Sequence, residues 1–355
     1  MNRKASLQAG LTLIELLIAM AISLLIVLAA AYLYLSATNA QRVQDRTTAS
    51  NETGAFAMQM LGRSIMNAGF YPANVAPIPA DITQTGMYDT YPPLPSSPRV
   101  ATDWANPAAN WPPVAFQTGV FGCDGAQFNT QNSTCGTSVA GAPDTLVINY
   151  FTSDSVAYGA TGQRLDCTGA DVGGDPSNAI RKTDAAGTAV VNTPPQLPLF
   201  VSNRYTLNNV NLYVGQGTAA TGSLACSGNG GSPHGDAGAG YQPLLAGIED
   251  MQFTYGLYSG TTSLSPDRFY TATEINALSN VVLNGQTFTG WQRVVSIRVC
   301  ILTKTLNGNA RIADKTGSEK TYQDCSGQSL AQPAGVAYSR FVEVFGVRNN
   351  LKQSY

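Results

Sequence analysis

Few residues in this chain have side chains suited to catalysis. The 355 residues include a single histidine, His234, which lies in a stretch rich in glycine, serine and proline. Neither a histidine-based metal site nor a Ser-His triad is therefore expected. Asp166, Asp171 and Asp175 place carboxylates among glycines, but their spacing matches no EF-hand loop, so a solvated loop is favoured over a calcium site. We expect no enzyme activity, no metal and no cofactor.

The six cysteines could support redox or metal chemistry, but their spacing favours structural disulfides. No C-x-x-C pair is present, which zinc ribbons and thioredoxin-like sites require. Their number is even, and all of them follow the N-terminal apolar segment, as expected for disulfides in an oxidising compartment. Sequential pairing is predicted because near neighbours in the chain meet most easily, and buried free thiols are the alternative. The predicted pairs are Cys123 with Cys135, Cys167 with Cys226, and Cys300 with Cys325.

Glu15 is the one charged residue in the apolar run 11–35, which contains neither glycine nor proline. This run is long enough to cross the ~30 Å hydrocarbon core of a membrane as a helix. Arg3 and Lys4 precede it and the next charge after Glu15 is Arg42, so the N-terminus is predicted to be cytoplasmic and the body exported. A cleaved secretory signal or a plain anchor is the alternative, but neither explains a carboxylate in the bilayer.

The helical pattern continues beyond the membrane segment. Large apolar residues recur there among polar ones, mostly about one helical turn apart, which predicts an amphipathic helix. These residues are Phe56, Met60, Leu61 and Ile65. Gly69 and Pro72 predict the C-terminal stop, and Gly54 is expected to weaken the helix by ~1 kcal/mol relative to alanine. One helix is predicted over 11–69, with 11–35 in the membrane and 36–69 amphipathic.

The remainder, residues 70–355, is predicted to be a β-rich and mainly antiparallel head, which makes the fold class α+β. Only 12% of residues are charged, and 35 glycines and 19 prolines favour short strands joined by turns. A hairpin is predicted over 199–214, turning near Asn208 and Asn209. The strand containing Val295 and Ile301 is expected to be the longest. Further strands are predicted over 144–151, 250–257 and 338–347.

The charge balance argues against nucleic acid as a partner. The 20 basic and 22 acidic residues give a net charge of −2, and the loss of Arg3 and Lys4 with a leader would leave 18 against 22, or −4. No basic run of the nucleic-acid-binding type remains.

The segment from Gly10 to Leu16, GLTLIEL, resembles the type III signal of type IV prepilins. The resemblance implies that residues 1–10 are a leader peptide, which the prepilin peptidase removes after Gly10 on the cytoplasmic side. It also implies N-methylation of the new terminus at Leu11 and a role for Glu15 in subunit assembly. Leu11 stands where major pilins usually have phenylalanine, a departure that is common among minor pilins.

The C-terminal strands carry a second resemblance, to PilW-like minor pilins. Residues 248–255 follow the pattern I-E-x-M-Q-F-x-Y, and Trp291 opens the pattern W-x-x-V-x-x-[IV]-R-[VI]. The closing strand ends in Val347, Arg348 and Asn349. The resemblance leaves residues 73–143 and 155–240 poorly covered.

Together, these resemblances imply a low-copy structural subunit that primes or caps type IV pilus assembly. The alternatives are a J-like pseudopilin of a type II secretion system, whose heads are usually shorter, and a pilin-anchored adhesin. The implied partners are the prepilin peptidase, other minor pilins, the major pilin and inner-membrane lipid, with a pilus-tip adhesin as a further candidate. The expected location is the inner membrane, with a single span and a periplasmic head, followed by incorporation at or near the pilus tip.

Overall fold

A computed structural model of the chain comprises two compact units, residues 1–49 and 50–355. The described residues are 12–70, 118–129, 134–151, 165–172, 182–183, 189–190, 200–214, 217–230, 240–258, 265–283, 286–304, 321–333 and 336–349. His234, Asp175, Gly10 and Leu11 lie outside them.

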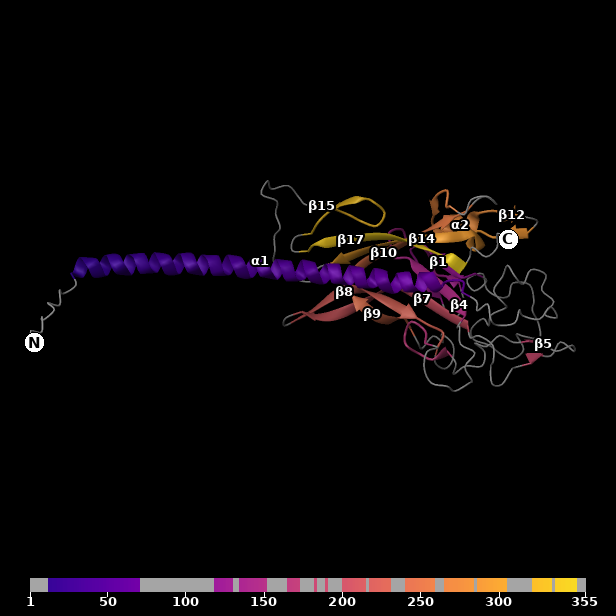
Figure 1. Ribbon diagram of the computed structural model, residues 1–355, viewed down its shortest axis with the longest axis horizontal. Helices are drawn as coiled ribbons and strands as arrows, with labels where there is room; N and C mark the ends of the chain where they lie inside the picture. The colour runs from indigo at the N-terminus through magenta and orange to yellow at the C-terminus, as the bar shows by residue number, and fades with distance from the viewer. Residues whose placement is uncertain are drawn as a thin grey trace, which may run out of the picture. The chain divides into compact units, whose positions relative to one another are not determined.

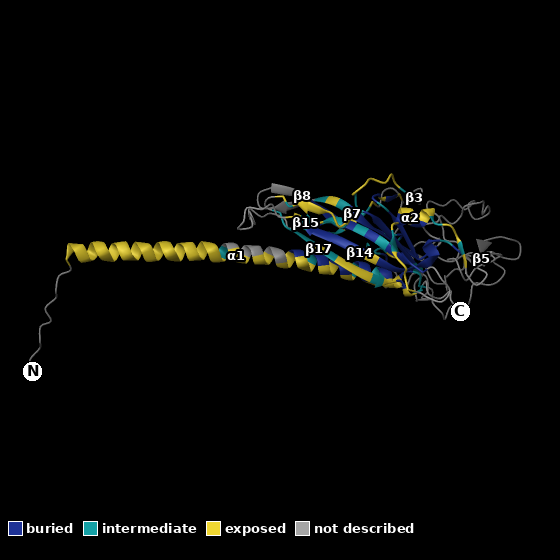
Figure 2. Ribbon diagram, turned by 90° about the horizontal axis from the view of Figure 1, so that it is seen from above, coloured by how far each residue is buried: buried dark blue, intermediate teal, exposed yellow. Residues whose placement is uncertain are grey.

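One long helix, α1, spans Leu13–Asn67. The predicted helix over 11–69 is therefore present, with ends that differ by two residues. Gly69 follows it in the left-handed conformation (φ 75°), as predicted for the C-terminal cap. Within the first unit, the helix from Leu13 to Thr38 is long and apolar enough to cross a membrane, with a mean hydropathy of 2.8 and none of its most apolar stretch buried. Figure 2 shows this part of α1 exposed and the C-terminal end largely buried on one side.

The second unit contains two larger antiparallel sheets, which lie on either side of the C-terminal end of α1 in Figure 1. The first sheet has the strand order β1-β4-β7-β8-β9. Its strands are β1 Val120–Cys123, β4 Thr145–Phe151, β7 Phe200–Val214, β8 Gly217–Ser227 and β9 Gln242–Ala246. The second sheet has the order β11-β10-β14-β17. Its strands are β10 Ile248–Leu257, β11 Phe269–Tyr270, β14 Val294–Lys304 and β17 Tyr338–Gly346.

Short elements complete the head. Each of four two-stranded pairs joins neighbouring segments of the chain, again antiparallel. They are β2 Phe128–Asn129 with β3 Thr134–Cys135, β5 Lys182–Thr183 with β6 Ala189–Val190, β12 Val281–Leu283 with β13 Gln286–Phe288, and β15 Thr321–Gln323 with β16 Ser329–Ala331. The helix α2 spans Ala272–Ala277, and a 3-10 turn spans Trp291–Arg293. The predicted α+β class with a mainly antiparallel head is thus confirmed.

Four of the predicted strands, β4, β10, β14 and β17, form where the apolar and alternating runs indicated. Met251, Phe253 and Tyr255 of β10 are all buried, as the alternation predicted. The prediction that β14 is the longest strand was wrong, because β14 has 11 residues and β7 has 15. The runs correctly predicted where strands form, whereas strand length depends on how far each pairing extends.

The predicted hairpin within 199–214 is also wrong, because β7 is one continuous strand that pairs with β8 from Arg204 to Val214. Asparagines favour turns when their side chains bond to their own backbone. Here distant residues occupy the Asn208 amide instead. Its Oδ1 accepts from Gln127 Nε2 at 3.0 Å, and its Nδ2 donates to the Tyr241 carbonyl at 3.0 Å. Contacts from elsewhere in the fold therefore override the local preference.

Three disulfides join the same pairs of cysteines that sequential pairing predicted: Cys123 with Cys135, Cys167 with Cys226, and Cys300 with Cys325. The third links β14 to the segment between β15 and β16. It therefore fixes that hairpin against one face of the second sheet.

The two sheets are connected through Gly247 and Asp144. Gly247 lies between β9 and β10, and its positive φ of 94° allows the chain to pass from one sheet to the other. Asp144, which precedes β4, is 4% exposed. Its Oδ1 accepts from the Gly125 N–H at 2.7 Å and its Oδ2 accepts from the Phe253 N–H at 2.8 Å. Its own N–H donates to the Met251 carbonyl at 2.9 Å, so one aspartate bonds β10 to the edge of the first sheet.

The buried position of Asp144 predicts a pH-dependent stability of the head. Burial raises the pKa of Asp144 from 3.8 to about 7, although the N–H groups of Phe253 and Gly125 act against it, and the charges of Asp124 and Asp250 raise it further. Because the folded pKa exceeds the unfolded one, the stabilisation is present below about pH 4 and is lost as the pH rises to about 7. We expect the free energy of unfolding to fall over this range by at most about 4 kcal/mol.

Chemical denaturation of the full chain in detergent at several pH values measures this slope. The variant Asp144→Asn cannot ionise, so it should have a flatter profile, although it loses one backbone acceptor and starts from a lower stability. The control is Asp267→Asn, at an exposed carboxylate, which should keep the wild-type slope. An unchanged slope in Asp144→Asn would show that other groups cause the pH dependence.

Candidate functional site

The N-terminal end of α1 is closed by Thr12 and Glu15, which form a capping box. The Thr12 N–H donates to Glu15 Oε2 at 3.0 Å, and the Glu15 N–H donates to Thr12 Oγ1 at 3.4 Å. The Thr12 hydroxyl also donates to Glu15 Oε2 at 2.9 Å. The carboxylate that the sequence predicted as an assembly residue therefore has a hydrogen-bonding partner in its own chain. It accepts two hydrogen bonds from Thr12, the residue immediately before α1.

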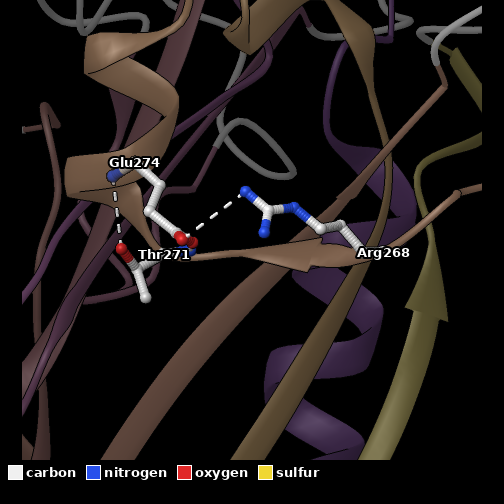
Figure 3. Close-up of polar contacts among 3 residues, drawn as sticks. All are labelled: Arg268, Thr271 and Glu274. Atoms are coloured by element: carbon white, nitrogen blue, oxygen red, sulfur yellow. Dashed lines mark hydrogen bonds and ion pairs between the residues drawn. The ribbon is translucent and has the colours of Figure 1, made fainter.

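The head contains a second capping box of the same composition at α2, where Thr271 and Glu274 take the places of Thr12 and Glu15 (Figure 3). Glu274 Oε2 accepts from the Thr271 N–H at 2.9 Å, while its Oε1 lies 3.6 Å from Arg268 Nη2. At α2 the glutamate thus uses one oxygen for the helix terminus, while its other oxygen lies near a cation.

The same division of oxygens applies at Glu15. Its Oε2 makes both bonds to Thr12, and within the described part of the chain its Oε1 has no partner. The positive end of the helix and the capping bonds hold the carboxylate in place, with one oxygen available to an amine. Gly10 and Leu11, the predicted cleavage and methylation residues, lie outside the described residues.

The C-terminal part of α1 buries one stripe of mostly small residues in the head. Its members are Ser50, Gly54, Ala57, Met58, Leu61, Gly62, Ile65 and Ala68. Leu61 and Ile65 lie on this face as predicted, but Phe56 is 54% exposed and Met60 is only partly buried. The largest apolar residues of the helix thus predict the buried face only in part. The packed face also contains glycine and alanine, because aromatic rings from the sheet occupy the space above them.

Two glycines of α1 lie directly under two phenylalanines of β17. A Cβ atom at Gly54 would overlap the ring of Phe341, and a Cβ atom at Gly62 would overlap the ring of Phe345. The spacings match, since eight helical residues span about 12 Å and four strand residues span about 13 Å. From helix propensity, Gly54 was expected to be a weak point of the helix. The structure shows instead that both glycines are sites of close approach, which helix propensity could not reveal.

Polar contacts fix this docking at both ends. Ser50 Oγ lies 2.7 Å from Thr303 Oγ1 in a buried contact, and Ser64 Oγ lies 2.6 Å from the Tyr205 hydroxyl. Asn349 Nδ2 donates to the Ala68 carbonyl at 2.9 Å, so a residue near the C-terminus satisfies the end of α1. The opposite side of this part of α1 remains exposed, including Phe56 and Met66.

In the described part of the aspartate-containing loop, hydrogen bonds occupy the Asp166 carboxylate. Asp166 is 7% exposed, and its Oδ1 accepts from Thr168 and Ala170 while its Oδ2 accepts from the Gly230 N–H at 2.8 Å. These bonds indicate that Asp166 shapes its own loop. No group of three potential metal-ligating side chains occurs among the residues that the structure describes.

Comparison with known proteins gives two family matches. Residues 211–349 match the family described as Type IV Pilus-assembly protein W, and residues 6–31 match the prokaryotic N-terminal methylation motif. The first match contains the whole second sheet, and the second contains Thr12 and Glu15. These matches confirm the predicted resemblance to PilW-like type IV minor pilins over these two segments and are consistent with a pilus-associated subunit.

Two further comparisons add little to this result. The structure is similar to that of a type IV-like pilin from Thermus thermophilus, with a TM-score of 0.28 and 10% sequence identity. The match covers 61% of this chain and 83% of that pilin. No curated protein matches the chain significantly.

The close contact between α1 and β17 makes a prediction that opposes helix propensity. Alanine at an ordinary helical glycine stabilises a protein by up to ~1 kcal/mol. Gly54→Ala and Gly62→Ala should instead each destabilise the head, by about 1–3 kcal/mol, because the added methyl group forces a phenylalanine ring out of its place. Thermal unfolding of the full chain in detergent is the measurement.

Matched double variants provide the control. Gly54→Ala combined with Phe341→Leu should regain part of the lost stability, and so should Gly62→Ala with Phe345→Leu. The crossed pair, Gly54→Ala with Phe345→Leu, should show no recovery. Stabilisation by either single alanine variant would contradict the close approach.

Proposed function

Because the chain is a type IV pilin-like protein with a PilW domain, we propose that it is a low-copy pilus subunit that primes or caps assembly. In this proposal residues 1–10 are a leader, 11–69 form the helix, with 11–35 in the inner membrane, and 70–355 form a periplasmic head. Other pilins, including the major pilin, are the partners, and the place in the pilus is at or near the tip.

The observation that carries the proposal is the state of the Glu15 carboxylate. Cleavage after Gly10 creates a positively charged amine at Leu11, one residue before the capping threonine. Glu15 Oε2 is held by Thr12, which leaves Oε1 for such an amine on the same chain or on a neighbouring subunit. A carboxylate held in place in the first turn of an apolar helix supports a role for Glu15 in positioning that helix among other subunits.

The first test of the proposal concerns processing. The mature protein should begin at methylated Leu11, because cleavage needs the small residue Gly10 before it. Mass spectrometry of the intact protein, extracted from membranes of a strain with active prepilin peptidase, determines the N-terminus. The same chain from a peptidase-deficient strain should retain residues 1–10. Retention in both strains would reject the proposed processing.

The second test separates the charge of Glu15 from its capping role. Glutamine is accepted at this position of a capping box, so Glu15→Gln keeps the helix start but cannot pair with an amine. If the charge serves assembly, Glu15→Gln and Glu15→Ala should both lower the number of pili per cell, while Thr12→Ala, which keeps the carboxylate, should have a smaller effect. Pili are counted by electron microscopy in a strain without the wild-type copy.

This comparison requires that membrane insertion and leader removal are unchanged in all three variants. Immunoblotting of membrane fractions checks both. If capping alone matters, Glu15→Gln should keep normal piliation and Thr12→Ala should lose it. Normal piliation in every variant would remove the assembly role of Glu15. A defect in protein secretion with normal pili would favour the pseudopilin alternative.

A further inference from the structure

The described part of the chain leaves one long sheet edge open. Each of the two larger sheets has two terminal strands, and three of these four are short or interrupted. β1 has four residues, β11 has two, and β9 has five, with Pro243 among them. β17 has nine residues without proline, and no other described strand pairs with its outer edge. Proteins normally protect such an edge, because it can pair with another chain.

The register shows which backbone groups of β17 are available. The Val347 N–H donates to the Val295 carbonyl at 2.8 Å, and the pairing with β14 keeps one register from Tyr338 to Gly346. In an antiparallel ladder, alternate residues direct their N–H and C=O groups to the same neighbour. Odd-numbered residues of β17 therefore bond to β14. Arg340, Val342 and Val344 direct theirs to the open edge.

Val342 and Val344 form an apolar strip along this edge, with the charged Arg340 at one end. Val342 is 47% exposed and Val344 is 50% exposed. Arg340 is exposed on β17, and Arg298, which pairs with Val344 from β14, is the one exposed residue in the middle of that strand. Neither arginine makes an ion pair with any described residue; Arg340 Nη1 is 3.4 Å from Gln323 Oε1 and Arg298 lies over the Phe269 ring.

A groove of about 480 Å³ lies beside the strip. It runs between the β15–β16 hairpin and the second sheet, and Tyr322, Tyr338 and Val342 contribute to its walls. The disulfide between Cys300 and Cys325 holds this hairpin, and the rings of Tyr322 and Tyr338 stack at 4.2 Å. The edge therefore has a rigid wall on one side, against which an added side chain can pack.

We propose that β17 is the docking edge for an extended segment of a different pilin-class subunit, which joins the second sheet as an additional strand. The open backbone groups recognise an extended chain of any sequence. The strip selects apolar residues opposite Val342 and Val344, and Arg340 selects a carboxylate at one end. The proposal rests on the proposed function, since that function supplies the other subunits.

A partner anchored in the same membrane fits this edge best. One added strand covers less surface than a stable soluble complex requires, so the contact needs a second attachment to raise the effective concentration. An apolar N-terminal helix of the type found at Leu13–Thr38 provides that attachment. A second copy of this chain fits less well, because pairing two β17 edges would bring the positive Arg340 side chains of both copies onto one face.

Photo-crosslinking in membranes of cells that produce the full chain tests the proposal. A benzophenone amino acid replaces Val342, and the control replaces Val282, which is 65% exposed on β12. The Val342 probe should form an adduct with one extended segment of another subunit that has its own N-terminal methylation motif, identified by mass spectrometry of the joined peptides. The Val282 probe should not form this adduct.

A proline at the edge provides the matched backbone control. Val344→Pro removes an N–H that points away from β14, so the head should still fold. The adduct yield should fall about tenfold, because one hydrogen bond to the added strand is lost. Val344→Thr keeps the N–H and the branched shape, and should keep most of the adduct. Resistance to protease confirms folding of both variants.

Each remaining outcome overturns the proposal. An adduct with a second copy of this chain assigns the edge to self-association, and an adduct with residues 71–117 or 305–320 of the same molecule shows that the chain closes its own edge. Absence of any adduct, or an adduct insensitive to Val344→Pro, removes β17 as the docking edge. Pili counted in a deletion strain report separately on the proposed function, which stands if deletion lowers piliation whatever the crosslinks show.

Discussion

The close approach between α1 and β17 is the constraint on which the rest of the head depends. Two glycines eight residues apart on the helix receive two phenylalanine rings four residues apart on the strand, because the two spacings are nearly equal. This contact sets both the rotation of the helix and its position along the sheet. The contact thereby positions the second sheet against α1. It also positions the hairpin fixed by Cys325 and the open edge of β17, which belong to that sheet or pack on it.

This docking divides the apolar residues of the head into two groups, one buried and one exposed. Leu61, Ile65 and their small neighbours are enclosed by both sheets, so they stabilise the head. Phe56 and Met66 on the helix, and Val342 and Val344 on the last strand, stay exposed next to that core. Scattered exposed apolar residues are ordinary, but those on β17 coincide with unused backbone groups, which makes this surface the stronger candidate for a partner.

Sequence patterns predicted the elements of this fold better than their contacts. The helix and the strands β4, β10, β14 and β17 follow from apolar, alternating or helical runs, which each segment contains in itself. The turn predicted at Asn208 failed because Gln127 and Tyr241, far away in the chain, bind its amide. The buried face of α1 was only partly predicted, since the need for glycine at position 62 appears only when Phe345 lies above it. The capping box at Thr12 was readable from threonine and glutamate three residues apart.

The contact between α1 and β17 joins the first described element of the chain to the last described strand. Gly54 meets Phe341, and Asn349 closes the end of the helix, so these contacts connect residues almost three hundred positions apart. Contacts between such distant residues form slowly, because a long loop must close first. During synthesis Gly54 and Gly62 therefore remain without their phenylalanine partners until β17 has been made. The two glycine–phenylalanine contacts are therefore among the last contacts of the described fold that can form as the chain is made.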